Sequence, residues 1–191
     1  MHRTPRSVEA GFTLIELAVV MVIVGIIAMA ALPSFRDFFD RYRLRGAADD
    51  VISLVANARA ESVKTDRDVR VSFGGSTVNW CVGANAAVEP TGGDPVAGAA
   101  ACDCTTPAQC LVGGQQMASA QGTHSNVSVA SVNTAFTFSS KLGVISPLGS
   151  ASSTLTSPSG KYDVRVVVDA LGHASACVPT GKPDMAGVPS C

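Results

Sequence analysis

The apolar residues of this chain follow two different periods, and the change between them separates a helical part from a β-rich part. No residue from Leu17 to Phe35 is charged. These 19 residues would form about 28 Å of helix, enough to cross the hydrocarbon core of a bilayer. Beyond them, apolar residues recur at intervals of three and four between charged ones, which predicts an amphipathic helix that continues to about Lys64. The stripe consists of Phe35, Phe39, Tyr42, Ala48, Val51, Ile52, Val55, Ala58 and Ser62.

The apolar period changes to two after Lys64, as expected for strands. Residues 68–73 alternate cleanly, Gly74-Gly75 is a turn signal, and residues 77–82 would form the partner strand of a hairpin. Further strand candidates are residues 126–132, 134–138, 163–168 and 173–178. One long helix followed by about six antiparallel strands predicts an α+β fold, in which the amphipathic half of the helix packs on a small sheet or sandwich.

Two residues interrupt the helical pattern. Pro33 removes a backbone hydrogen bond and is expected to kink the helix. Gly46 is expected to be tolerated without a special role, at a cost of about 1 kcal/mol.

Composition and charge argue against a nucleic-acid partner. Charged residues make up only 15% of the chain and its net charge is −1. From Thr65 onward eight acidic residues outnumber six basic ones, and binding to DNA requires several phosphate contacts. The six are Arg67, Arg70, Lys141, Lys161, Arg165 and Lys182.

The chain has an even number of cysteines, which in an exported protein indicates up to three disulfides. They are Cys81, Cys102, Cys104, Cys110, Cys177 and Cys191. Six cysteines allow fifteen pairings, so spacing alone does not decide the connectivity. We expect Cys177 and Cys191 to pair, because they bracket a Pro- and Gly-rich loop whose closure would contribute about 3 kcal/mol. Cys81 would then pair within the group of the other three.

The sequence does not predict a catalytic, metal-binding or phosphate-binding site. Cys102 and Cys104, with Cys110 and His124 downstream, have the wrong spacing for a closed zinc site. His124 and His173 are interpreted as exposed or turn residues. No nucleophile motif and no phosphate-binding glycine loop are present. We therefore predict no enzyme, no metal and no cofactor.

The N-terminus contains one residue that simple targeting signals do not explain. A signal peptide cleaved near Ala28-Met29-Ala30, or a plain membrane anchor, would each account for the apolar run. Neither accounts for Glu16 at its edge, because a carboxylate in the membrane costs about 2.5–3.5 kcal/mol at mid-depth. Such a residue is a functional candidate whose partner has to be found.

The string Gly-Phe-Thr-Leu-Ile-Glu-Leu from Gly11 to Leu17 resembles the prepilin cleavage motif of type IV pilins and type II secretion pseudopilins. The resemblance implies that a prepilin peptidase cuts after Gly11 and methylates the new terminus at Phe12. It also implies that Glu16 meets the terminal amine of a neighbouring subunit. A buried acid and a buried amine offset one another, whereas either alone is penalised.

The order of elements resembles the GspH/FimT (FimU-like) minor pilins and pseudopilins. Residues 54–62, Leu-Val-Ala-Asn-Ala-Arg-Ala-Glu-Ser, look like the run that ends the helix in that group. Residues 172–175 lie where relatives have an arginine-bearing strand, but both arginines are missing here. The resemblance implies a leader over residues 1–11, a helix over 12–64 and a periplasmic β-rich domain over 65–191. Residues 12–35 would be transmembrane or in the filament core, and pilins often staple their C-terminal loop with one disulfide.

Three functions follow from the resemblance. The first is a minor pilin in the initiating or tip complex of a type IV pilus, and the second is an H-type pseudopilin of type II secretion. The third, capture of DNA for transformation, is disfavoured by the charge of the body and the missing arginines. Expected partners are other minor and major pilins or pseudopilins, the prepilin peptidase and the inner-membrane assembly platform. The chain would cross the inner membrane once before it joins a pilus or pseudopilus.

Overall fold

The computed structural model describes residues 12–87, 101–120, 124, 126–130, 135–146 and 148–191, without the side chains of 30–33 and 120. One helix, α1 (Leu14–Thr65), precedes all the strands. The chain forms two compact units, Met1–Phe39 and Asp40–Cys191. The boundary falls inside α1, so the second half of the helix belongs to the same unit as the sheets. We call the second unit the body.

The C-terminal end of α1 is defined by local backbone geometry. Asp66 adopts a left-handed conformation with φ of +51°, and the Arg67 amide donates back to the Ser62 carbonyl over 3.2 Å. This hydrogen bond spans six residues and satisfies a carbonyl of the last helical turn. Asp is among the residues that adopt a left-handed backbone most readily. The helix therefore ends within a residue of the predicted position.

The buried face of α1 begins later than the sequence pattern indicates. Ala48, Val51, Val55, Ala58 and Ser62 are buried as expected, and Leu44 and Ala47 join them. In contrast, three predicted members of the stripe are exposed, with exposed fractions of 50–71%: Phe35, Phe39 and Tyr42. Their assignment to the sheet-facing stripe was wrong, because periodicity shows which side of a helix is apolar but not where along its length another element covers that side.

A five-stranded sheet contains the predicted hairpin. It has the order β5-β2-β1-β7-β8, with all neighbours antiparallel. The strands are β1 (Val69–Gly75), β2 (Trp80–Ala86), β5 (Ala118–Ala120), β7 (Ala135–Phe138) and β8 (Ile145–Ser146). The turn differs from the prediction. Gly74 and Gly75 pair with Cys81 and Trp80 inside the ladder, and the chain reverses at residues 76–79, where the Ser76 amide donates to the Asn79 carbonyl.

A four-stranded sheet has the order β11-β10-β9-β6. Its strands are β6 (Ser128–Val129), β9 (Ala151–Thr156), β10 (Asp163–Val168) and β11 (Ala174–Cys177). Strand β10 coincides with the predicted residues 163–168. Strand β9, Ala-Ser-Ser-Thr-Leu-Thr, was not predicted, because its serines and threonines give little apolar alternation. A short hairpin, β3 (Leu111–Val112) and β4 (Gln115–Gln116), follows a 3₁₀ turn η1 (Pro107–Gln109).

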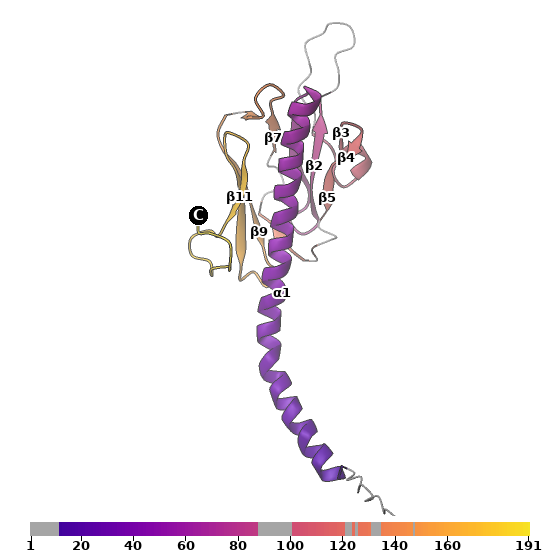
Figure 1. The fold of residues 1–191 in the computed structure, drawn as a ribbon, viewed down its shortest axis with the longest axis vertical. Coiled ribbons are helices and arrows are strands. Elements are labelled where there is room, and N and C mark those ends of the chain that lie inside the picture. Colours follow the sequence, from indigo (N-terminus) through magenta and orange to yellow (C-terminus); the bar gives the residue numbers. More distant parts are fainter. Residues whose placement is uncertain (1–11, 88–100, 121–123, 125, 131–134, 147) are drawn as a thin grey trace, which may run out of the picture. The chain divides into compact units, whose positions relative to one another are not determined.

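Within the body, the core lies between α1 and the two sheets. Figure 1 shows α1 crossing the body, with labels β2 and β5 on one side of it and β9 and β11 on the other. Buried side chains of α1 pack with Val71 and Phe138 of the first sheet and with Leu155 and Val166 of the second. The Trp80 indole donates to the Val127 carbonyl over 2.8 Å, which satisfies its buried N–H. The α+β architecture predicted from the sequence is confirmed.

Arg59 connects α1 to two turns of the body. Its Nε donates to the Gly143 carbonyl, in the turn between β7 and β8, over 3.0 Å. A Cβ added at Gly172, in the turn between β10 and β11, would lie 3.0 Å from the same Nε and 2.6 Å from the Gly143 oxygen. Both turns therefore approach the helix at this side chain.

Arg59→Ala is expected to lower the free energy of unfolding by about 1–3 kcal/mol, the range for losing a hydrogen bond from a charged donor. Urea unfolding of the full chain in detergent can be followed by the fluorescence of Trp80, the only tryptophan. Lys141→Ala, an exposed residue of the β7–β8 turn, is the control and should change stability by less than about 0.5 kcal/mol. An equal loss of stability in both variants would contradict a stabilising role of the hydrogen bond between Arg59 and the Gly143 carbonyl.

Candidate functional site

The start of α1 carries the residues that the sequence marks as functional. The Leu17 amide donates to the Thr13 carbonyl and the Glu16 amide to Thr13 Oγ1, over 3.2 and 3.3 Å. Thr13 is therefore the N-cap, and Glu16 lies in the first turn, where the helix dipole favours a carboxylate. Threonine followed by glutamate three residues later is also the spacing of a capping box. Glu16 can therefore stabilise the start of the helix, in addition to the assembly contact that the motif predicts.

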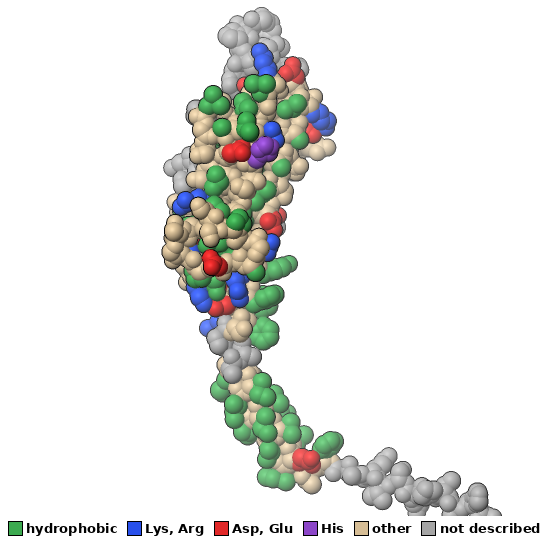
Figure 2. Space-filling model, turned by 60° about the vertical axis from the view of Figure 1, so that its left-hand side comes forward, with side chains coloured by type: hydrophobic (Ala, Val, Ile, Leu, Met, Phe, Trp, Pro, Cys, Tyr) green, Lys and Arg blue, Asp and Glu red, His purple; other side chains and the backbone are tan. Residues whose placement is uncertain are grey.

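The first half of α1 presents apolar side chains that are not covered within the part of the chain that the structure describes. Every side chain from Phe12 to Met29 is exposed, except that Gly25 is half-buried. Figure 2 shows them as a green surface along this part of the helix. Leaving so many large apolar side chains in water is unfavourable at about 25 cal/mol per Å², so this surface needs a membrane or a partner.

In the described residues, no single helix combines the length and the apolar composition needed to cross a bilayer. Leu14–Met29 and Ser34–Thr65 meet that criterion when they are taken together. Two predicted sites lie outside the described residues. They are the cleavage residue Gly11 and the side chain of Pro33, the predicted kink.

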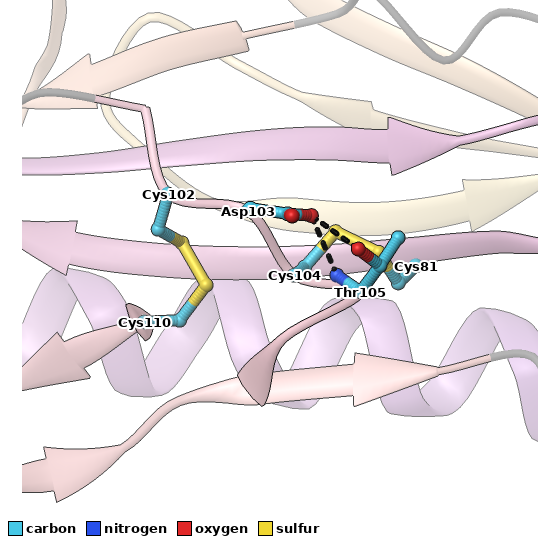
Figure 3. The surroundings of a disulfide bond; sticks show 6 residues. All are labelled: Cys81, Cys102, Asp103, Cys104, Thr105 and Cys110. Atoms are coloured by element: carbon cyan, nitrogen blue, oxygen red, sulfur yellow. Dashed lines mark hydrogen bonds between the residues drawn. A yellow bond between two sulfur atoms is a disulfide. The ribbon is translucent and has the colours of Figure 1, made fainter. Parts of the chain in front are cut away.

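Four cysteines form two adjacent disulfides against the β1–β2 hairpin (Figure 3). Cys81 of β2 pairs with Cys104, and Cys102 pairs with Cys110 next to η1. Three of the four are at most 2% exposed. The Cys81–Cys104 disulfide anchors the segment around residues 102–110 to the sheet, and the Cys102–Cys110 disulfide closes that segment on itself. Together they keep a stretch with few apolar residues ordered.

Two glycines make room for these sulfurs. A Cβ at Gly83 of β2 would lie 2.6 Å from Cys110 Sγ and 2.9 Å from Cys102 Sγ, and one at Gly74 of β1 would lie 2.9 Å from Cys104 Sγ. Such distances are shorter than side chains tolerate. Gly74, predicted as a turn residue, instead belongs to a flat surface on which a disulfide rests.

The Cys-x-Cys sequence does not offer thiolates to a metal, because its two cysteines belong to different disulfides. Among the described residues, no group of three or more His, Cys, Asp or Glu side chains is arranged to hold a metal ion. Asp103, between the two cysteines, accepts hydrogen bonds from the Thr105 hydroxyl and amide, at 2.5 and 3.0 Å. These two bonds, the hydroxyl first, lower the pKa of the Asp103 carboxyl.

The third disulfide joins Cys177 to Cys191, the pair expected from the sequence. The loop that it closes folds back on Val178, whose amide and carbonyl bond to Pro189 and Cys191 over 2.8 and 2.9 Å. The C-terminal residues thus continue the backbone pairing beyond β11.

His124 is not the exposed turn residue that the sequence suggested. Its ring lies on α1, with Nε2 2.8 Å from Asp50 Oδ2, and its side chain is 18% exposed. A Cβ at Gly46 would lie 2.7 Å from the ring. The interpretation of Gly46 as merely tolerated was therefore wrong, because the missing side chain leaves space for the imidazole. His173 is exposed, with Nδ1 3.4 Å from Asp169.

Three of the basic residues that follow the helix lie apart from one another. Arg70 lies on β1 and Arg165 on β10, in different sheets, and Lys182 forms an ion pair with Asp163 over 3.1 Å. A row of arginines such as DNA capture would use is not formed by these three.

Both halves of the chain match models of known protein families. Residues 6–32 match a family model described as a prokaryotic N-terminal methylation motif. Residues 47–172, about two thirds of the chain, match the model described as type II transport protein GspH. Over 42 residues the chain is 45% identical to the fimbrial protein EcpC of Eikenella corrodens, a match that covers 22% of this chain and 28% of that protein. The chain thus spans little more than a quarter of that relative's length. No solved structure matches it.

Proposed function

Because this chain belongs to the GspH family of pilin-like and pseudopilin-like proteins, we propose that it is a minor pilin of a type IV pilus, placed in the initiating or tip complex. It acts as a structural subunit. The observation that carries this proposal is the exposed apolar surface of the first half of α1. It begins at the methylation motif, and from Leu14 to Phe35 it contains a single carboxylate, Glu16. A helix of this kind suits a subunit that moves from a bilayer into the apolar centre of a filament.

The proposed processing follows the motif residue by residue. A prepilin peptidase cuts after Gly11 and methylates the amine of Phe12. The mature chain crosses the inner membrane once through residues 12–35, and its body lies in the periplasm. Three disulfides fit that oxidising compartment. Glu16 then meets the Phe12 amine of the neighbouring subunit when the filament assembles, and the assembly platform and other pilins are the partners.

The intact mass of the protein purified from membranes tests the processing. We expect a chain that begins at Phe12 and carries one methyl group, and whose mass rises by about 6 Da on reduction as three disulfides each take up two hydrogens. A chain that begins near Ala31 would instead be the product of an ordinary signal peptidase, and the filament proposal would be abandoned.

A second candidate, an H-type pseudopilin of type II secretion, is favoured by the description of the matching family model. The similarity to a fimbrial protein and the two disulfides around residues 81–110 favour the pilus. Deletion of the gene distinguishes them. Loss of surface pili with normal export of secreted proteins supports the minor pilin, whereas blocked export with normal pili supports the pseudopilin.

A further inference from the structure

Strand β11 is an edge of the four-stranded sheet, and no strand that the structure describes covers its outer side. It pairs with β10 alone. Two other edge strands of the larger sheets, β6 and β8, have only two residues each and bond to turns of the opposite sheet. The Val129 amide donates to the Thr77 carbonyl over 2.9 Å, and the Ile145 amide donates to the Ala170 carbonyl over 3.2 Å. Strand β11 has four residues, and Figure 1 shows it at the margin of the body beside the C-terminal loop.

The backbone groups of Ala174 and Ala176 point away from β10. In an antiparallel pair, successive residues of a strand bond alternately toward their partner and away from it. The His173 carbonyl accepts a hydrogen bond from the Asp169 amide over 3.0 Å, so residues 173, 175 and 177 bond toward β10. Ala174 and Ala176 therefore each direct one N–H and one C=O to the outer side of the sheet.

The C-terminal residues use the same edge but leave it after one residue. The amide and carbonyl of Val178 bond to Pro189 and Cys191 in a parallel arrangement. The pairing cannot continue toward β11, because Pro189 has no N–H and the Val188 amide donates to the Met185 carbonyl over 3.0 Å. This edge thus pairs with an extended segment at Val178, whereas no described segment pairs with it at residues 174–176.

The side chains of β11 do not discourage pairing with another strand. Natural sheets protect their edges with charged residues, prolines or bulges, and the sequence Ala-Ser-Ala-Cys has neither charge nor proline. Ala174 and Ala176 pack on the core but are only half-buried. Because side chains alternate between the faces of a strand, an added strand with apolar residues at every second position would cover them.

The direction of β11 argues against a second copy of this chain as the occupant. Arg45, near the start of the body, donates to the Ala186 carbonyl in the loop after β11 over 2.9 Å. Arg59, near the end of α1, would lie 3.0 Å from a Cβ at Gly172, just before β11. The strand therefore runs antiparallel to this part of α1. An antiparallel pair of two β11 strands would reverse one body relative to the other, which does not suit subunits anchored in one membrane.

We propose that the outer edge of β11 pairs with an extended, uncharged segment of a different pilin-like subunit next to it in the filament. This inference rests on the proposed function, which supplies that neighbour. The backbone of the segment would bond to Ala174 and Ala176, and its apolar side chains would extend the core. So short a pairing is weak between free proteins, but subunits held in one membrane by their apolar helices meet at a high effective concentration.

Amide hydrogen exchange of the full chain in detergent, followed by NMR, tests whether the edge is available. The amides of Ala174 and Ala176 should exchange at least about tenfold faster than those of Ser175 and Cys177, which bond to β10. Equal protection of all four amides would mean that another segment of the same chain already covers the edge, and the proposal would be overturned.

Photocrosslinking in cells that make filaments tests which segment binds. A p-benzoylphenylalanine in place of exposed Ser175 would lie within reach of a side chain on an added strand. Irradiation should join it to a second protein that carries an N-terminal methylation motif. Ala176→Pro should lower the yield of this adduct at least about fivefold, because proline removes an outward N–H that β10 does not use. The control Ala176→Gly keeps that N–H and should keep most of the adduct.

The remaining outcomes each contradict the proposal. An absent adduct, or one that Ala176→Pro leaves unchanged, would exclude backbone pairing at this edge. An adduct to a second copy of the chain, or to a protein without the motif, would show a different occupant. Trp80 fluorescence and an intact mass with three disulfides show that each variant is folded. Sheared filaments probed for the subunit report the minor-pilin function separately, so an adduct that forms in membranes without incorporation would contradict that function and not the pairing.

Discussion

Glu16→Ala is expected to abolish incorporation of the subunit into filaments while the body stays folded. In an apolar filament centre, the carboxylate would offset the Phe12 amine of the next subunit. Breaking one partner of a buried ion pair costs about 3–5 kcal/mol, which lowers an assembly equilibrium by two to more than three orders of magnitude. Filaments sheared from cells and probed with antibody to the body should therefore lack the variant, although membranes contain it.

Glu16→Gln separates the assembly contact from the capping role of the same residue. Glutamine fits the capping box as well as glutamate does, but it has no charge to offset an amine. If assembly depends on charge, glutamine should fail as completely as alanine. Normal incorporation of the glutamine variant would mean that Glu16 acts through the helix start that Thr13 caps. Glu61→Gln, near the other end of the same helix, is the control and should assemble normally, because Glu61 pairs with exposed Lys64.

Gly83→Ala is expected to destabilise the body by at least about 2 kcal/mol, in the upper part of the range for overpacking a filled site. The added methyl group would lie 2.6 Å from Cys110 Sγ and 2.9 Å from Cys104 Cβ. Neither atom is the far end of a flexible chain, since both belong to disulfide-bonded residues. Urea unfolding followed by Trp80 measures the loss, and alkylation with mass analysis should find free thiols in part of the purified variant.

A double-mutant cycle shows whether the loss comes from the disulfide. In a chain that already carries Cys102→Ala and Cys110→Ala, two sulfurs next to Gly83 are gone, so the same Gly83→Ala change should cost at least about 1 kcal/mol less. An equal cost in both backgrounds would mean that alanine perturbs β2 itself rather than the packing of sulfur on the strand.

Local signals in the sequence were enough for the long helix and the first hairpin. Periodicity and the backbone preferences of neighbouring residues are local properties of the sequence. They were sufficient to predict the uncharged run from Leu17, the end of α1 near Lys64 and the strand at residues 163–168. The motif around Gly11, Phe12 and Glu16 is equally local. Its chemistry was proposed from adjacent residues, and the match of residues 6–32 to a methylation motif places it in the same class.

Only the tertiary structure decided features that depend on what lies opposite a residue. Gly74 was predicted as a turn residue and Gly83 had no predicted role, but both lie under the sulfurs of disulfides. Gly46 had no assigned role until His124 was placed on the helix. The pairing among Cys81, Cys102, Cys104 and Cys110 depended on how the segment around residues 102–110 folds onto β2. Arg41 of α1 and Lys161 of the turn between β9 and β10 likewise meet at the ring of Tyr162. Periodicity describes one element at a time, whereas these contacts arise only when separate elements pack together. The sequence by itself therefore determined the helix and the main strands, and the tertiary structure decided which residues contact one another between them.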